Sequence, residues 1–176
     1  MRLLKCQQEE EYERFVYFLL QNRNMFDEAF GVSYSLFDAI GSLYLILGQE
    51  NVLLILDEQE EMIGFACYTY GTRENQFEDQ HIAFVNCAVL KPNYRRSRAF
   101  LYYFKQLTKL MKEEKDDIKE FRFYAYRHHN YTQRLYRKFA TVIGEIEDQF
   151  AIKDIFSVEF SQLCEYLEQF DKKIRV

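Results

Sequence analysis

The stretch that decides the fold is Val85–Leu107, VNCAVLKPNYRRSRAFLYYFKQL. It opens as an apolar run, crowds four basic residues around Pro92 and Ser97, and ends with apolar side chains at helical spacing. The first N–H groups of a helix have no partner inside it, and the helix dipole is positive at that end. A strand, a basic turn and a helix therefore predict a site for an anion, with a pyrophosphate as its natural occupant. A solvated turn with surface arginines is the alternative interpretation.

The composition predicts one domain over residues 1–176. The chain has 176 residues, 48% of them hydrophobic, which suffices for one core of ordinary size. It has 14 tyrosines, 17 phenylalanines and no tryptophan, so we expect a core built largely from phenyl rings. The N-terminus turns acidic after six residues, and no window is long and apolar enough to span a membrane. We therefore expect a cytoplasmic protein without a membrane partner.

Charge is distributed unevenly along the chain, although the net charge is only −5. Residues 91–112 carry seven basic side chains and no acid, and residues 121–144 carry five more with two histidines and no acid. Subtracting these twelve from the 23 basic residues leaves 11 against all 28 acids. A basic face on an acidic body favours an anionic ligand over general adhesion. Two solvated basic helices are the other explanation.

The cysteines, Cys6, Cys67, Cys87 and Cys164, show neither CxxC spacing nor a cluster with histidine. This pattern predicts no zinc site and no disulfide framework. We interpret all four as reduced, small apolar residues.

Hydrophobic periodicity predicts helices over residues 7–23, 33–49, 100–111, 131–140 and 161–170. A serine starts the second of these, and Ser161 is expected to cap the last, a short C-terminal helix. Apolar runs predict strands over 1–6, 51–57, 61–72, 81–90, 120–126, 141–147 and 152–160. The strands over 51–57 and 61–72 form a hairpin around an acidic turn, and the last two strands are expected to be antiparallel neighbours. This order predicts an α/β fold with a mixed sheet, whose ligand lies where the helix follows the fourth strand.

Three segments resemble the GNAT superfamily of acetyl-CoA-dependent N-acyltransferases: LLILDEQEEMIGFACYTYGT, AVLKPNYRRSRAF and RLYRKFA. The resemblance covers roughly residues 51–160 and implies a mixed, mostly antiparallel central sheet of about seven strands flanked by helices. In the family, Gln or Arg, two residues, Gly, one residue, and Gly or Ala hold the CoA pyrophosphate. Arg95 stands at the first position, whereas Arg98 and Phe100 stand at the two small-residue positions. The cofactor-binding residues that the resemblance implies are Val89, Leu90, Arg95, Arg96, Ser97, Arg98, Ala99, Phe100, His129 and Asn130.

The second family motif reads Asn, two residues, Ala, two residues, Leu-Tyr, one residue, Lys, one residue, Gly-Phe. This chain keeps Leu135, Tyr136 and Lys138. It has His129 at the Asn position, Thr132 at the Ala, Ala140 at the Gly and Thr141 at the Phe. Asn130 lies one residue from the Asn position and is the alternative occupant of it. The equivalent of Tyr136 protonates the CoA thiolate in GNAT enzymes, so the resemblance implies that Tyr136 is catalytic.

The implied function is acetyl transfer from acetyl-CoA to a primary amine of a small molecule or peptide, by direct attack and without a metal. The implied polarising group is a backbone N–H near Val89 and Leu90. Candidate bases near the fourth strand are Glu78, Asp79, His81 and Asn86. The segments FDEAFGVSYS and RENQFEDQ are acidic and aromatic, which suits a cationic acceptor. Exposed tyrosines and phenylalanines would also suit a homodimer.

Two other functions stay open. A catalytically degenerate GNAT-fold module could use the basic face to hold a partner, because Arg98 and Phe100 replace small residues. FRFYAYRHHNYTQRLYRKF interleaves basic and aromatic residues, as single-stranded nucleic-acid binders do. The acidic net charge of the chain argues against nucleic acid as a partner.

Overall fold

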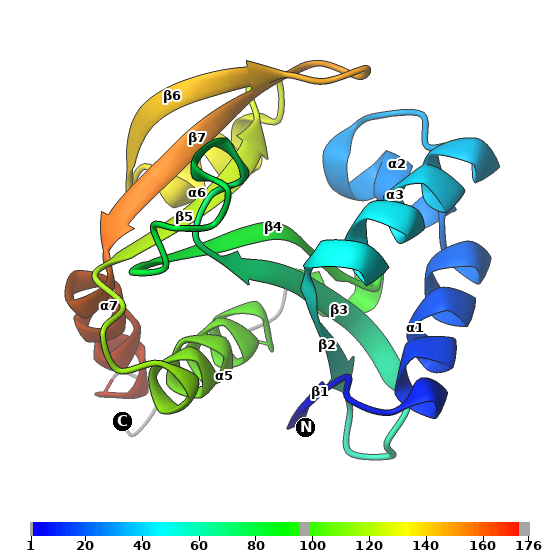
Figure 1. Cartoon of the computed structure of the whole chain (residues 1–176), viewed down its shortest axis with the longest axis horizontal. Helices are drawn as coiled ribbons and strands as arrows, with labels where there is room; N and C mark the ends of the chain where they lie inside the picture. Colours follow the sequence, from blue (N-terminus) through cyan, green and yellow to red (C-terminus); the bar gives the residue numbers. More distant parts are fainter. Residues whose placement is uncertain (1, 96–98, 173–176) are drawn as a thin grey trace. The chain divides into compact units, whose positions relative to one another are not determined.

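The strands of the computed structural model, which describes residues 2–95 and 99–172, are hydrogen-bonded in the order β1-β2-β3-β4-β5-β7-β6. Their bounds are β1 Arg2–Lys5, β2 Asn51–Leu56, β3 Met62–Tyr70, β4 Ile82–Leu90, β5 Glu120–Tyr126, β6 Thr141–Glu147 and β7 Ile152–Glu159. β1 with β2, β2 with β3, β5 with β7 and β6 with β7 pair antiparallel, whereas β4 and β5 pair parallel. The expected mixed, mostly antiparallel sheet of about seven strands is confirmed (Figure 1).

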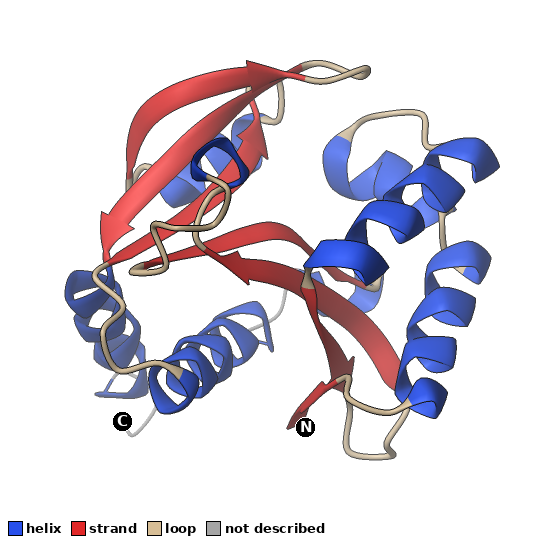
Figure 2. Cartoon of the chain, viewed as in Figure 1, coloured by secondary structure: helices blue, strands red, loops and turns tan. Residues whose placement is uncertain are grey.

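The described helices are α1 Glu9–Gln21, α2 Asn24–Phe30, α3 Leu36–Gln49, α4 Pro92–Arg95, α5 Ala99–Glu114, α6 Asn130–Tyr136 and α7 Phe160–Lys172, with a 3₁₀ turn η1 at Arg73–Asn75 (Figure 2). The chain divides into two compact units. Unit 1 comprises residues 1–69 and 86–100, and unit 2 comprises residues 70–85 and 101–176, so β4 contributes to both.

Unit 1 is built by α1, α2 and α3 packing on the β2–β3 hairpin (Figure 1). The apolar spacing of α1 places Phe15 and Leu19 in the core, next to Phe65 of β3, and the ring centroids of Phe15 and Phe65 lie 5.0 Å apart. Gln8 and Glu11 form a capping box that starts α1. In β2 the side chains of both faces are buried, which explains its continuous apolar run.

Gly64 of β3 lies against the end of β4 inside unit 1. A Cβ built on Gly64 would lie 2.2 Å from the carbonyl oxygen of Val89 and 2.8 Å from a methyl carbon of Leu90. No rotamer change can relieve a clash with a backbone carbonyl. Glycine therefore permits a backbone approach that any side chain would prevent.

Unit 2 contains the β6–β7 hairpin, β5, α6 and α7. Its interior is a cluster of rings in which Phe123 stacks on Phe156 at 5.4 Å and Phe104 meets Phe121 at 5.4 Å. Phenyl rings thus fill the interior of unit 2, as expected, but among all described buried residues the aliphatic side chains are more numerous. In β5 the buried residues alternate with less buried ones up to Ala125, which reflects the period of two.

The sequence missed two helices. α2 is a seven-residue helix whose left-handed C-cap is Gly31, and it lies in a stretch expected to be a connection. α4 is a single turn that begins at Pro92, a residue expected only to end the strand. Proline suits the first position of a helix, because it lacks the N–H that would be unpaired there.

Helix boundaries also differ from expectation. α3 begins after Ser35, whose hydroxyl accepts from the Asp38 N–H, and not at Ser33. The prediction that Ser161 caps the last helix is wrong, because α7 begins at Phe160 and the Ser161 hydroxyl donates to Glu159. α6 ends at Tyr136, four residues before the expected end.

We expect Gly64→Ala to lower the free energy of unfolding by about 3 kcal/mol, because the methyl group must displace the Val89 carbonyl. Gly144→Ala is the matched control, since a Cβ there meets only Cδ1 of Ile155, at 3.6 Å. The control should change stability by no more than about 0.5 kcal/mol. Urea unfolding measures both, and equal effects would contradict the proposed close approach.

Candidate functional site

The guanidinium of Arg95 is bound inside unit 1. Its Nε donates to the carbonyl oxygen of Leu90 at 2.7 Å, and its Nη2 donates to that of Met25 at 2.7 Å. Nη1 lies 3.7 Å from the carboxylate of Glu28. Burial lowers the pKa of Arg95, although Glu28 opposes this shift. The side chain at the first position of the pyrophosphate motif therefore ties the end of β4 and α4 to α2.

The rest of the predicted cofactor segment is only partly described. Arg96, Ser97 and Arg98 lie outside the described residues. α5 begins at Ala99, runs for 16 residues and has no acid in its first turn, as an anion site at its N-terminus requires. Phe100 is half-buried, whereas Val89 and Leu90 are buried at the end of β4.

Tyr136 ends α6 in unit 2. Its ring meets Phe123 edge-on at 4.7 Å and contacts Phe139 and Phe156, with centroids 6.0 and 5.8 Å away. Burial of the hydroxyl in this aromatic setting, with a smaller contribution from Tyr131, raises the pKa of Tyr136 to about 12. The phenol is therefore protonated at every physiological pH. Among the residues that the structure describes, none forms a hydrogen bond with this hydroxyl.

His129 and Asn130 stand at the start of α6. His129 is the N-cap residue, and its Nδ1 lies 2.9 Å from the Thr132 hydroxyl. Asn130 is exposed and is the first residue of the helix. Two of the four residues that differ from the family motif, His129 and Thr132, thus contact each other at the helix N-terminus.

A buried carboxylate, Asp154 of β7, holds α6 against the sheet of unit 2. Asp154 is 2% exposed and accepts from Nε of Arg127 at 2.9 Å and from Nε2 of Gln133 at 3.0 Å. Gln133 also donates to the Tyr126 carbonyl and accepts from Arg137. Because Gln133 lies three residues before Tyr136, this network fixes the helix that carries the tyrosine. This network was not predicted from the sequence, although an aspartate inside an apolar strand was a usable signal.

Asp79, one of the candidate bases, accepts hydrogen bonds from residues of its own loop. Burial would raise the pKa of Asp79, but hydrogen bonds from the Thr72 hydroxyl, the Asn75 amide and the Thr72 N–H lower it to about 2. A carboxylate with this pKa is a weak proton acceptor at neutral pH, which argues against Asp79 as a base. Glu78 and His81 are exposed, and Asn86 is partly buried.

None of the four cysteines, all of which the structure describes, forms a disulfide, and burial raises the pKa of Cys6 to about 12 and that of Cys67 well above its usual range. Within residues 2–95 and 99–172, no group of three or more metal-binding side chains is assembled. No helix in this described part is both long and apolar enough to cross a bilayer.

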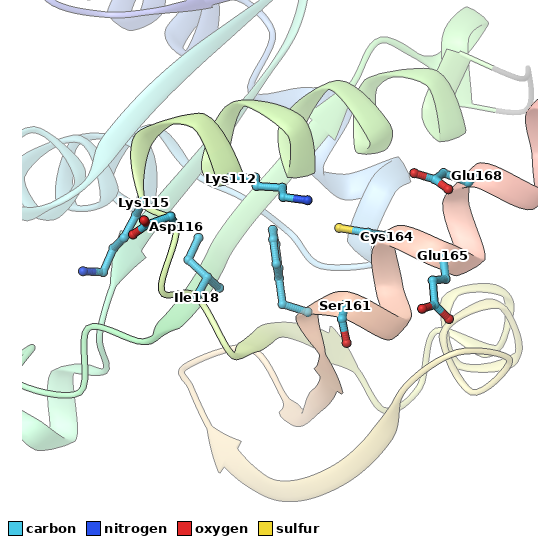
Figure 3. A pocket seen from close by; sticks show the side chains of 9 residues that line it. Lys112, Lys115, Asp116, Ile118, Ser161, Cys164, Glu165 and Glu168 are labelled. Carbon is cyan, nitrogen blue, oxygen red and sulfur yellow. The ribbon is translucent and has the colours of Figure 1, made fainter.

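A pocket of about 320 Å³ lies between α5 and α7 (Figure 3). Lys112 and Cys164 face each other across it, and Glu165 and Glu168 line the α7 side. None of the predicted site residues lines this pocket.

Neither a protein-family model nor a curated protein sequence matches this chain. Solved structures do match it. Spermidine N-acetyltransferase from Vibrio cholerae, in complex with CoA and spermine, has a TM-score of 0.62 at 14% identity, covering 92% of this chain and 97% of that one. A structure from Desulfovibrio desulfuricans assigned to the GNAT family has a TM-score of 0.61 at 12% identity, covering 90% and 99%.

PaiA N-acetyltransferase from Thermoplasma acidophilum, in complex with coenzyme A, has a TM-score of 0.57 at 15% identity, covering 90% of this chain and 99% of that one. Likeness at such low identity concerns the arrangement of the elements. This chain therefore has the GNAT fold, as the three sequence segments predicted.

We expect Asp154→Ala to lower the free energy of unfolding by about 3 kcal/mol, since it removes the buried acceptor that Gln133 and Arg127 share. Glu145→Ala removes the exposed partner of the same Arg127 and should cost no more than about 0.5 kcal/mol. Thermal and urea unfolding of the two variants measure the difference. Similar losses would show that burial of Asp154 is not what stabilises α6.

We expect Asp79→Asn to destabilise the protein by about 1 kcal/mol at pH 7, because the amide replaces an acceptor oxygen with a donor. The folded-state pKa of Asp79 is depressed, so its stabilisation is complete above the unfolded pKa of about 3.9 and is lost toward the folded value of about 2. Urea midpoints of both proteins should therefore converge between about pH 4 and pH 2. A constant difference across this range would contradict the assignment.

Proposed function

We propose that this protein transfers an acetyl group from acetyl-CoA to a primary amine. The observation that carries the proposal is the GNAT fold together with Tyr136, which ends α6 with a protonated hydroxyl. Two structures of the same fold, both of N-acetyltransferases, hold CoA.

The residues proposed to hold CoA are Val89, Leu90, the segment from Arg95 to Phe100, His129 and Asn130. The fit rests on the 16-residue helix α5, whose first turn carries no acid. Positive charge for the pyrophosphate comes, in this proposal, from Arg96 and Arg98. Arg95 contributes by fixing the turn, because its guanidinium is bound to the carbonyl oxygens of Leu90 and Met25.

In the proposed reaction the amine nitrogen bonds to the thioester carbonyl carbon, the carbon–sulfur bond breaks, and the proton that nitrogen loses is balanced by one gained on sulfur. Acetyl-CoA supplies the activated acetyl group. A thiol has a pKa of about 8.5, so a phenol with a pKa of about 12 does not surrender its proton permanently to the thiolate. Tyr136 therefore donates a hydrogen bond to the leaving sulfur, and if its proton passes to sulfur, the proton that the amine nitrogen loses restores the phenol.

The acceptor is proposed to be an amine, and a cationic one is the first to test. A cationic acceptor is suggested by the acidic segments FDEAFGVSYS and RENQFEDQ, but three of their five acids already have partners within the chain. Asp27 accepts from the Tyr34 N–H, Glu28 pairs with Arg95, and Asp79 accepts hydrogen bonds within its loop. Glu74 and Glu78 are exposed. An amino-acid or peptide amine is therefore tested alongside polyamines and amino sugars.

A catalytically inactive binding module is the second candidate, favoured by the internal use of Arg95. Calorimetry with CoA separates the two. Heat of binding saturating below millimolar CoA supports the transferase. No heat at millimolar ligand would overturn it and leave the module.

We expect Tyr136→Phe to reduce kcat about 100-fold or more while leaving the fold intact, because only the hydroxyl is lost. Tyr17→Phe, at an exposed tyrosine of α1, is the control and should leave kcat unchanged. Release of the CoA thiol, followed with a panel of amines, measures turnover. If Tyr136→Phe turned over like the wild type, Tyr136 would have no part in the reaction.

A further inference from the structure

α3 has an uncharged apolar face that no part of unit 1 covers. The face comprises eight residues: Leu36, Phe37, Ile40, Gly41, Tyr44, Leu45, Leu47 and Gly48. Phe37 is 85% exposed and Tyr44 is 83% exposed. On the opposite side, Ala39, Leu43 and Ile46 are buried in the core of unit 1. A helix that is apolar all round is normally covered on every side, so this exposed face calls for a partner.

The α3 face carries no charge that association would have to desolvate. Asp38 is the one charged residue between Leu36 and Gln49, and its carboxylate accepts from the Ser35 N–H at 2.7 Å in the capping box. The helix has no lysine or arginine. An anionic membrane surface therefore has nothing to attract it there.

Large and small residues alternate along the centre of the α3 face. Phe37, Gly41, Tyr44 and Gly48 follow each other at spacings of four, three and four, which places them on one side of the helix. A Cβ built on Gly41 or on Gly48 meets no atom within 4 Å. The backbone at both glycines is therefore open to a close neighbour.

We infer that the α3 face pairs with the α3 face of a second copy of this chain, in an antiparallel arrangement around a twofold axis. In such an interface residue i contacts j while j contacts i. An axis passing between Ser42 and Leu43 places Phe37 opposite Gly48 of the other copy. The same axis places Tyr44 opposite Gly41, so all four aromatic rings enter glycine gaps in a single register.

The area of the α3 face fits a weak dimer. Aromatic side chains present roughly 150–250 Å² each, so Phe37 and Tyr44 together expose roughly 250–400 Å². The four half-exposed aliphatic side chains add roughly 100–250 Å². Two copies would bury roughly 700–1,300 Å², around the lower limit of about 1,000 Å² for specific interfaces. The dimer should therefore be weak, so that its population depends on protein concentration.

Sedimentation velocity of the full chain from about 1 to 200 µM tests the pairing. We expect a reversible dimer, and Tyr44→Glu should raise its dissociation constant about 30-fold or more, because the ring is lost and a charge is buried. Tyr17→Glu, at another exposed tyrosine, should leave the dissociation constant unchanged. A monomer at 200 µM would overturn the proposal, as would a dimer that Tyr44→Glu does not weaken. Binding of the monomer to phosphatidylcholine vesicles through Tyr44 would also overturn it, by assigning the face to a membrane.

Cysteine cross-linking tests the register. In the inferred register, position 37 of one copy lies opposite position 48 of the other, so the two copies of position 37 are eleven residues, or about 16 Å, apart along the helices. This is too far for a disulfide, whose Cβ atoms lie about 4 Å apart. We expect F37C combined with G48C to give an oxidised dimer, and F37C alone to give no more than the wild type. Cross-linking by F37C alone would overturn the antiparallel arrangement.

Discussion

The partly buried guanidinium of Arg95 is the contact on which the geometry of the basic segment depends. It links two carbonyl oxygens that are far apart in sequence, those of Met25 and Leu90, and so fixes α4 against α2 directly after β4. Charge-assisted hydrogen bonds of this kind are strong and directional. The family motif suggests that Arg95 binds a phosphate, but its guanidinium instead links two parts of unit 1. Arg96 and Arg98 follow it in the sequence.

In unit 2 a buried carboxylate fixes the position of a short helix. Asp154 accepts hydrogen bonds from Arg127 and Gln133, and the bond to Gln133 holds the helix that ends at Tyr136. A seven-residue helix has little stability of its own, so such anchoring is what gives the tyrosine a defined place. The aromatic cluster around Tyr136 then sets its chemistry, because a phenol among phenyl rings loses its proton less easily.

Periodicity was a sound guide wherever an element has one buried face. The strands and α1, α3 and α5 were predicted from it, whereas the GNAT fold was implied by the resemblance of three segments and is shown by the solved structures. It failed for α2 and α4, which are too short to show a repeat, and at Ser161, where a capping residue type lies one position inside the helix. Within the proposed site, Tyr136, His129 and Asn130 and a helix near them were predicted from the sequence. The hydrogen-bond network of Asp154 that holds this helix was not.

By itself the sequence determined the order of the elements, the aromatic core and the concentration of basic residues after β4, because these depend on local spacing and composition. Only the tertiary structure decided what individual polar side chains do. Arg95 turned inward to carbonyl groups, Asp79 was committed to its loop, and Asp154 was buried between two arginines and a glutamine. Their partners lie up to 70 residues away in the chain, and no local pattern encodes which distant acceptor a buried donor will meet.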